Sequence, residues 1–490
     1  MNKRHNRYLT FGFAFVTSCI SNFSWAACTA ASPTQSLTIT LNDPKARTIS
    51  PDFFGFDTPW AEFQTGYFRN GAVKSALIDY LKPFRGALYR YPGGNSFGWE
   101  NSILNAAVRQ LSFTDYLGSL KPDFGVQEYL KFLNDVDGSG LYVLNLLGTK
   151  KEPYSATKIQ ASNLALVRWV RSQPQGSRIK YWELANELDW EPLNLTAAEY
   201  INRMQGTLTE AQNQFPSEKL IVAGRTNPWK FGITSETTFN KQVAQAYPFY
   251  GIALHAYYDG YAMPMMLDTI KRYAQVKNKA GQATKVFVTE HGRWPTEIPN
   301  GRWEDNWYQA SGSLGAISAS DFALMTLNTP EVATAVWHAL GTSGPWQLIH
   351  RNPANDSLYP SATYWGLRTL REGFLNQAIT VSPSINVSGD YLGGYSYRLS
   401  AMQGANKAFS LLGVNRGKTP MNFTVSLASR SAFYITKINT TAFDPAGADN
   451  EAATPNKFQM LSLAPGATSV NQFNICVPAF SVFSLLAKGV

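Results

Sequence analysis

The sequence is poor in cysteine and in clustered metal ligands, which narrows the chemistry it can support. Only three cysteines and five dispersed histidines occur among 490 residues. Neither Cys-x-x-Cys nor His-Glu-x-x-His is present, which argues against zinc chemistry. Gly-x-Ser-x-Gly and glycine-rich phosphate loops are missing too, so serine-hydrolase and nucleotide-dependent reactions are disfavoured. We expect neither a metal nor a cofactor.

Long apolar runs are also missing, apart from one near the N-terminus. Three cations among the first seven residues precede an apolar stretch over residues 11–20, and Ser24, Trp25 and Ala26 follow it. This pattern is typical of a secretory signal peptide. We therefore predict a signal peptide over residues 1–26 and a secreted or periplasmic mature protein. Nothing beyond it approaches the roughly 20 apolar residues that span a bilayer, so we expect no membrane span.

Charge of one sign is not concentrated anywhere in the chain. The formal net charge of +9 falls to +6 without the three cations of the signal peptide, and the remaining charges are scattered. Nucleic acid is therefore not an expected partner. A mildly basic surface is compatible with an acidic polysaccharide, although an ordinary surface of an exported protein is the simpler interpretation.

Few cysteines remain once the signal peptide is removed. Cys19 leaves with it, so Cys28 and Cys476 stay in an oxidising compartment. We expect a disulfide that joins the two ends of the mature chain. Lipidation of Cys28 is the alternative, and Trp25 counts against it because lipoprotein signals usually carry an aliphatic residue at this position.

Between residues 50 and 372, short apolar runs alternate with amphipathic helical stretches such as Val126–Asp135 and Ala197–Phe215. This alternation is typical of an α/β protein with a parallel (β/α)8 barrel. The eight predicted strands are Asp52–Asp57, Ala87–Gly93, Leu141–Gly148, Lys180–Glu187, Lys219–Gly224, Gly251–Tyr257, Lys285–Glu290 and Ala333–Ala339.

From residue 373 to 490 the long helical stretches end and alternating segments take over. They predict a C-terminal antiparallel β-sandwich. Ser36–Leu41, within residues 27–49, alternates as well and is expected to complete the sandwich from the N-terminal end, which would bring Cys28 towards Cys476. The predicted strands are Gly394–Met402, Lys407–Val414, Met421–Leu427, Ala432–Asn439, Phe458–Leu463 and Ser481–Leu486.

Two glutamates end predicted barrel strands, where barrel enzymes carry their chemistry. The fourth strand ends in Asn186 and Glu187, and the seventh ends in Glu290. Hydrolysis of a glycosidic bond requires two carboxyl groups, one that donates a proton to the leaving oxygen and one that stays ionised. A single glutamate at a strand end is more often a solvated terminus, but the two positions together favour a glycosidase.

Other polar and aromatic residues occur at or after the remaining strand ends. Indole rings offer apolar faces on which sugars stack, although core packing is the commoner role of a tryptophan. The candidates are Arg90 on the second strand and Asn95 after it, His255 and Tyr257 on the sixth, Trp294 after the seventh, and Trp337 and His338 on the eighth, with further tryptophans at positions 99, 303, 307 and 346.

At these motifs the sequence resembles the glycoside hydrolases of clan A. "WELANE" at residues 182–187 is similar to their acid/base motif, and "VTEHG" at residues 288–292 is similar to their nucleophile motif. "RYPGGN" followed by "WENSI" resembles family 51 α-L-arabinofuranosidases, and "FGVQEYLKF" resembles a helix start that families 51, 39 and 79 share. The resemblance spans almost the whole mature chain.

This resemblance implies roles for individual residues. Glu187 would be the acid/base and Glu290 the nucleophile of a retaining enzyme. Asn186 would hydrogen-bond the sugar 2-hydroxyl, and Tyr257 would hold the nucleophile. Arg90 would lie beside the nucleophile and lower its pKa. His255 would contact either the substrate or the acid/base, or would simply be a satisfied barrel histidine.

The leading interpretation is a secreted retaining glycosidase of the α-L-arabinofuranosidase type that acts on an oligo- or polysaccharide. The predicted first strand and the residues after it, Phe53–Trp60, lack the glycine-rich, glutamate-containing segment that family 51 has there, which leaves furanose specificity open. The alternatives are an endo-acting glycosidase, or a β-xylosidase- or β-glucuronidase-like enzyme, on an exopolysaccharide. A carbohydrate-binding barrel without catalysis is the alternative from another class.

Overall fold

The computed structural model describes residues 34–490 except 95–96, 115–116, 150–152, 191–192, 226–231, 259–262, 296–301, 342–343, 386–394 and 466–467. The predicted signal peptide, Cys28 and Asn95 lie outside the described residues. None of the described helices is both long and apolar enough to cross a membrane.

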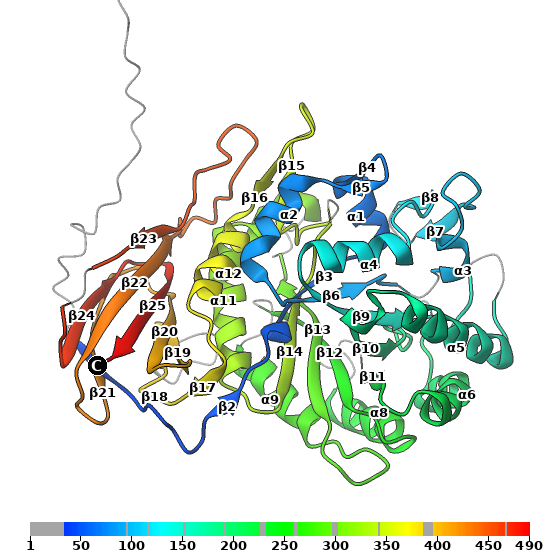
Figure 1. The fold of residues 1–490 in the computed structure, drawn as a ribbon, viewed down its shortest axis with the longest axis horizontal. Helices are drawn as coiled ribbons and strands as arrows, with labels where there is room; N and C mark the ends of the chain where they lie inside the picture. Colours follow the sequence, from blue (N-terminus) through cyan, green and yellow to red (C-terminus); the bar gives the residue numbers. More distant parts are fainter. Residues whose placement is uncertain are drawn as a thin grey trace, which may run out of the picture.

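Eight parallel strands close into a barrel, which confirms the predicted (β/α)8 architecture (Figure 1). Each of the eight predicted runs contributes one strand. The barrel consists of β3 (Phe54–Asp57), β6 (Leu88–Tyr91), β9 (Ser139–Leu144), β10 (Ile179–Leu184), β11 (Lys219–Ala223), β12 (Gly251–Tyr258), β13 (Lys285–Arg293) and β14 (Val332–Trp337).

Helices connect these strands, and some of them begin at side-chain caps that the sequence supplies, namely Ser155, Thr196 and Ser361. The Thr196 hydroxyl accepts a hydrogen bond from the Glu199 amide at 3.3 Å, and the Glu199 carboxylate accepts one from the Thr196 amide at 2.8 Å, which is a capping box. The helices include α1 (Trp60–Tyr67), α2 (Ser75–Leu81), α3 (Trp99–Ser102), α4 (Val126–Asp135), α5 (Ala156–Ser172), α6 (Ala197–Gln214), α8 (Ile233–Gln245), α9 (Met263–Ala274), α10 (Tyr308–Ser311), α11 (Ser313–Leu327) and α12 (Ala362–Glu372).

The inside of the barrel has an apolar layer below a polar one. Because side chains on a strand alternate between its two faces, the residue two positions after an inward apolar side chain also points inward. The apolar layer contains Leu88, Tyr181, Ala253 and Phe287, and the polar layer nearer the carboxyl ends contains Arg90, Glu183, His255 and Thr289. The strand period therefore places charged side chains together at one end of the barrel.

An extra residue in β13 brings one more side chain into this polar layer. Leu254 of β12 pairs with Val288, but the next residue, His255, pairs with Glu290. Thr289 is thus the additional residue of a β-bulge, a feature that re-aims side chains next to active sites. As a result, both Thr289 and Glu290 hydrogen-bond residues of the barrel interior.

The C-terminal part is a sandwich of two sheets, as predicted. The larger sheet has the order β2-β17-β19-β20-β25-β22-β23, and the smaller has the order β18-β1-β21-β24. Their strands are β1 (Gln35–Ile39), β2 (Arg47–Thr48), β17 (Gln377–Ile379), β18 (Val381–Ser382), β19 (Tyr397–Gln403), β20 (Ala408–Asn415), β21 (Met421–Leu427), β22 (Phe433–Ala442), β23 (Leu461–Leu463), β24 (Gln472–Val477) and β25 (Ser481–Gly489).

The N-terminal strand joins the sandwich, but it does so with mixed pairing. β1 pairs antiparallel with β18 and parallel with β21, with Leu37 opposite Val425. The parallel pair follows from the long chain crossover between β1 and β21, since parallel neighbours need such a connection. Cys476 lies on β24, opposite Asn422.

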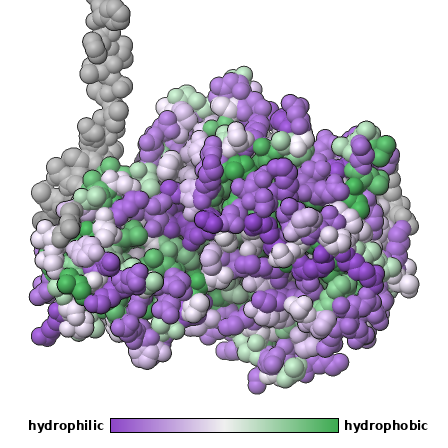
Figure 2. All heavy atoms as spheres, viewed as in Figure 1, coloured by the Kyte–Doolittle hydropathy of each residue, from purple (hydrophilic) through white to green (hydrophobic). Residues whose placement is uncertain are grey.

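The barrel and the sandwich pack against each other through α11 and α12, which lie between them in Figure 1. Fourteen of the fifteen residues of α11 are buried, as expected for a helix covered on all sides. Asp321 of α11 accepts hydrogen bonds from Arg398 at 2.6 Å, from Arg416 at 2.5 Å and from the Tyr395 hydroxyl. The outer face in Figure 2 is mainly hydrophilic, with apolar residues in small separate groups.

Candidate active site

Arg90 is the centre of the polar layer and is completely buried at the end of β6. Its Nε donates to Glu183 at 2.6 Å, its Nη1 donates to Glu290 at 2.8 Å and its Nη2 donates to the Asn186 side-chain oxygen at 2.6 Å. The planar guanidinium directs its donors in fixed directions. Arg90 therefore sets the relative positions of the ends of β10 and β13.

Glu290 is buried and is surrounded by donors and cations. Besides the bond from Arg90, its Oε2 accepts a hydrogen bond from the Tyr257 hydroxyl at 2.7 Å. The Nδ1 atoms of His255 and His338 lie 3.5 Å and 3.8 Å from the same oxygen. Burial alone would raise the pKa of Glu290, but the charges of both imidazoles and of Arg90, with the Tyr257 hydrogen bond, lower it to about 2. Glu290 is thus held ionised.

Glu187 is more open and contacts an imidazole. Its side chain is 28% exposed, and its Oε1 lies 2.6 Å from His255 Nδ1. Burial lowers the pKa of His255, but the charges of Glu290 and Glu187 outweigh this effect and raise it to about 9, so His255 is protonated at neutral pH. A carboxylate oxygen of Glu187 lies within 4.8 Å of a carboxylate oxygen of Glu290. The two glutamates predicted at the strand ends therefore meet.

The turn after β10 that aims Glu187 contains two residues in the left-handed region. Ala185 has a φ of 70° and Glu187 a φ of 48°. Such conformations are uncommon for residues with a Cβ atom and cost energy. A glycine would adopt the backbone conformation of Ala185 at a lower cost, so this turn is locally strained.

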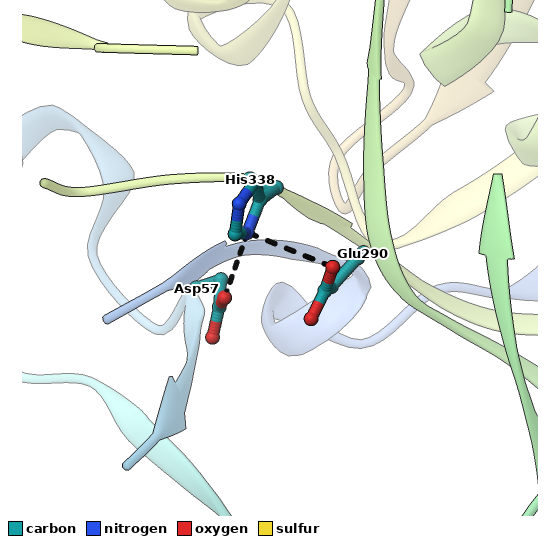
Figure 3. A group of neighbouring side chains, drawn as sticks. All are labelled: Asp57, Glu290 and His338. Carbon is teal, nitrogen blue, oxygen red and sulfur yellow. Dashed lines mark hydrogen bonds and ion pairs between the residues drawn. The ribbon is translucent and has the colours of Figure 1, made fainter. Parts of the chain in front are cut away.

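Asp57 and His338 form a second carboxylate–imidazole pair on Glu290, as Figure 3 shows. Asp57 ends β3 and is 1% exposed, and its Oδ2 lies 2.8 Å from His338 Nδ1. His338 directly follows β14. Burial lowers the pKa of His338, but Glu290 and Asp57 raise it above its usual value. Asp57 was not predicted as a site residue, although it ends a predicted strand, whereas His338 was predicted as a supporting group on the eighth strand.

Glu183 was also missed, although it lies inside the "WELANE" motif. It is fully buried, and besides Arg90 it accepts a hydrogen bond from the Thr289 hydroxyl at 3.1 Å. A charged residue in the middle of a buried strand needs a partner of opposite charge. This rule could have identified Glu183 as a site residue, since Arg90 lies on another predicted strand of the same barrel.

The prediction of Trp337 as a substrate-binding residue is wrong. Val336 belongs to the barrel interior, so the next side chain faces outward. Trp337 is fully buried against His291, and its indole N–H donates to the backbone oxygen of Trp346 at 3.1 Å. His338, one residue later, reaches the site instead.

Two other tryptophans do adjoin the site. The ring of Trp346 lies 4.9 Å from that of Tyr257 and 5.3 Å from that of His338, between centroids. Trp294 lies 5.7 Å from Tyr257 and 5.6 Å from Trp346. Trp294 is therefore placed beside the residue that holds Glu290, whereas Trp99 is buried and donates to Ser162 at 3.0 Å.

Among the residues that the structure describes, two groups of three side chains have ligand atoms close enough to one another to hold a metal ion. One contains Asp57, Glu290 and His338, and the other contains Glu187, His255 and Glu290. A metal would need a deprotonated imidazole nitrogen in each group. Because the pKa of both imidazoles is raised, these groups favour protons over metal ions.

Comparisons with known proteins add evidence on the fold. No protein-family model matches the chain, and no curated protein does. Among solved structures, an α-L-arabinofuranosidase from Thermotoga maritima in complex with arabinose is 15% identical, with a TM-score of 0.75 over 93% of this chain and all of that chain. A family 51 α-L-arabinofuranosidase from Thermotoga petrophila is 16% identical, with a TM-score of 0.74 over 92% of this chain and all of that chain.

The fold is that of the family 51 arabinofuranosidases. A family 44 xyloglucanase from Paenibacillus polymyxa is similar over 93% of this chain and all of its own, with 12% identity and a lower TM-score of 0.60. The resemblance that the motifs indicated is thus confirmed for the three-dimensional structure. At these identities the likeness concerns the fold, and the activity must be argued from the site.

Proposed function

We propose that the protein is a retaining glycoside hydrolase, with Glu290 as the nucleophile and Glu187 as the acid/base. The observation that carries this proposal is the approach of their carboxylate oxygens to within 4.8 Å. Retaining enzymes have carboxyl groups about 5 to 5.5 Å apart, whereas inverting enzymes separate them by about 6.5 to 9.5 Å to admit a water. The short separation favours direct attack by Glu290.

In the first step, Glu290 attacks the anomeric carbon and the bond from that carbon to the leaving oxygen breaks. Glu187 gives a proton to the leaving oxygen, and a covalent glycosyl ester forms on Glu290. In the second step, Glu187 removes a proton from water, the water oxygen attacks the same carbon, and the ester bond to Glu290 breaks. Arg90 and Tyr257 hold the nucleophile in position through both steps.

His255 stores the proton for the first step. At neutral pH the imidazole of His255 is protonated and lies 2.6 Å from Glu187, so it can pass its proton through the Glu187 carboxyl to the leaving oxygen. When Glu290 becomes an ester its negative charge disappears, which removes one of the causes that raise the pKa of His255. His255 loses a positive charge when its proton leaves, and Glu290 loses a negative charge when it becomes an ester. The net charge of the cluster of Glu187, His255 and Glu290 is therefore the same before and after the first step.

For the substrate, the leading candidate is an α-L-arabinofuranoside or a similar neutral glycoside. This rests on the likeness of the fold to α-L-arabinofuranosidases and on charge. Each positively charged side chain near Glu290 is already paired with a carboxylate. Arg90 contacts Glu183 and Glu290, His255 contacts Glu187, and His338 contacts Asp57. A uronate would add a further negative charge to this cluster, which disfavours a β-glucuronidase-like activity.

A panel of nitrophenyl glycosides, with arabinan, xylan and acidic polysaccharides, tests this proposal. Cleavage of the arabinofuranoside is the expected result, and NMR of the first-formed product should show the same anomeric configuration as the substrate. Glu290→Gln should abolish turnover while circular dichroism shows a folded protein. Glu331→Gln is the matched control, because Glu331 is exposed and directly precedes β14 at the opposite end of the barrel.

Each outcome separates the alternatives. Inversion at the anomeric carbon would contradict the assigned mechanism, and full activity of Glu290→Gln would contradict the assigned nucleophile. Binding of saccharides by wild-type protein without any cleavage would support the non-catalytic barrel. Cleavage of polymers alone would favour endo-action.

A further inference from the structure

Apart from the candidate active site, the structure has a cavity of about 370 Å³ between the loop after β14 and a segment of the sandwich, residues 448–451. This size falls within the range typical of small-molecule sites. The aromatic side chains in its wall are Trp307, Tyr308 and Tyr359, and polar side chains include Gln347, His350 and Asn450. We call it the interdomain cavity.

The interdomain cavity shares a loop with the candidate active site. Trp346 contacts Tyr257, which donates to Glu290. The residues on either side of Trp346, Pro345 and Gln347, line the interdomain cavity. One short stretch of chain, residues 345–347, therefore borders both the interdomain cavity and the candidate active site.

The sandwich side of the cavity is fixed by hydrogen bonds to the barrel part. Asp449 accepts from the Ser311 hydroxyl and the Ala362 amide, each at 2.7 Å, and lies 2.9 Å from His350 Nε2. Asn450 donates to the Pro360 oxygen at 2.8 Å. A wall held in this way binds a ligand without first having to become ordered.

We propose that the interdomain cavity is a subsite for sugar units of the substrate chain beyond the unit held at Glu290, and this inference rests on the proposed function. Aromatic rings offer apolar faces to the C–H faces of sugars, and amide and imidazole groups bond hydroxyls. Tyr308 is 44% exposed, so its ring is available to such a unit. The substrate is then an oligosaccharide or a polymer rather than a small glycoside.

Chain-length dependence tests this subsite. kcat/KM is measured on arabinan-, xylan- and xyloglucan-derived oligosaccharides of two to six units and on the best nitrophenyl glycoside. In the wild type, the longer saccharides should be favoured. Tyr308→Ala should lower the ratio of kcat/KM for long over short substrates by about 2- to 12-fold, the effect of losing one aromatic contact. Gln347→Ala, as a second variant, should lower it in the same direction.

Tyr250→Ala is the matched control. Tyr250 is similarly exposed, at 41%, and precedes β12 at the opposite end of the barrel. The Tyr250→Ala variant should therefore have the same ratio of kcat/KM for long over short substrates as the wild type. A wild-type ratio independent of chain length, or an unchanged ratio in both Tyr308→Ala and Gln347→Ala, would overturn the subsite. If the wild type cleaves nothing, the proposed function fails instead. Calorimetric titration with the same saccharides then decides whether the cavity binds them.

Discussion

Replacing His338 with glutamine should raise the pKa of Glu290. The protonated imidazole lies 3.8 Å from Glu290 Oε2. Two unit charges at this distance attract by about 1 kcal/mol at the dielectric constant of water and by about 4 kcal/mol at an effective constant of 20. These energies correspond to about one to three pKa units. Glu290 starts from a pKa of about 2, so we expect roughly 3 to 5 in the variant.

The assay is the pH profile of kcat/KM, which reports the free enzyme. Glu290 must be ionised to attack, so activity falls as the pH drops through its pKa. The wild type should keep its activity down to about pH 3, one unit above the pKa of Glu290, whereas His338→Gln should begin to lose activity below about pH 4 to 6. Assays after brief acid exposure and return to neutral pH separate titration from unfolding.

Asp57→Asn is the control, because this substitution should not move the acid limb of the pH profile to higher pH. It removes an anion that raises the pKa of His338, but the imidazole still carries its proton in the acid range. The charge beside Glu290 persists, so the acid limb should not move to higher pH. Coincident acid limbs for His338→Gln and the wild type would refute the role of His338, and so would equal upward shifts in both variants.

Four further predictions follow from other parts of the molecule. Asp321→Asn leaves the buried Arg398 and the partly buried Arg416 poorly paired and should cost about 3 to 5 kcal/mol in urea unfolding. Because the pKa of His255 is raised to about 9, kcat/KM should fall about tenfold per pH unit above that value, and His255→Gln should lack this limb. Trp337→Phe should lower stability by about 1 to 3 kcal/mol without raising KM, since this side chain is core. A non-reducing peptide map should join Cys28 to Cys476, and a free thiol at Cys476 would contradict that bond.

The barrel was predictable because its strands are short apolar runs between amphipathic helices. Each of the eight runs became a strand, with ends shifted by a few residues. The sandwich was harder to predict, since strand β24, with the sequence QFNICV, has an irregular burial pattern and no clear alternation. Phe458 fits a strand pattern, but it packs on Phe443 outside any strand.

The site was only partly predictable because a strand position does not by itself decide which way a side chain points. Trp337 and His338 are neighbours, and only the register of β14 shows that the first faces the core and the second faces Glu290. In β13, simple alternation from Phe287 would turn Glu290 outward, and the bulge at Thr289 corrects this. Such bulges depend on pairing with the neighbouring strand, which local sequence patterns do not reveal.

The burial of α11 on all sides has a consequence for how the chain can be divided. A helix in the outer layer of a free-standing barrel has one face in water, but nearly every residue of α11 is buried. The charge of Asp321 is paired with arginines from the sandwich. A truncated protein that ended after α12 would expose apolar surface and a carboxylate without its counter-ions. The barrel therefore depends on the sandwich for its stability, and joining it to a different domain would require redesign of this helix.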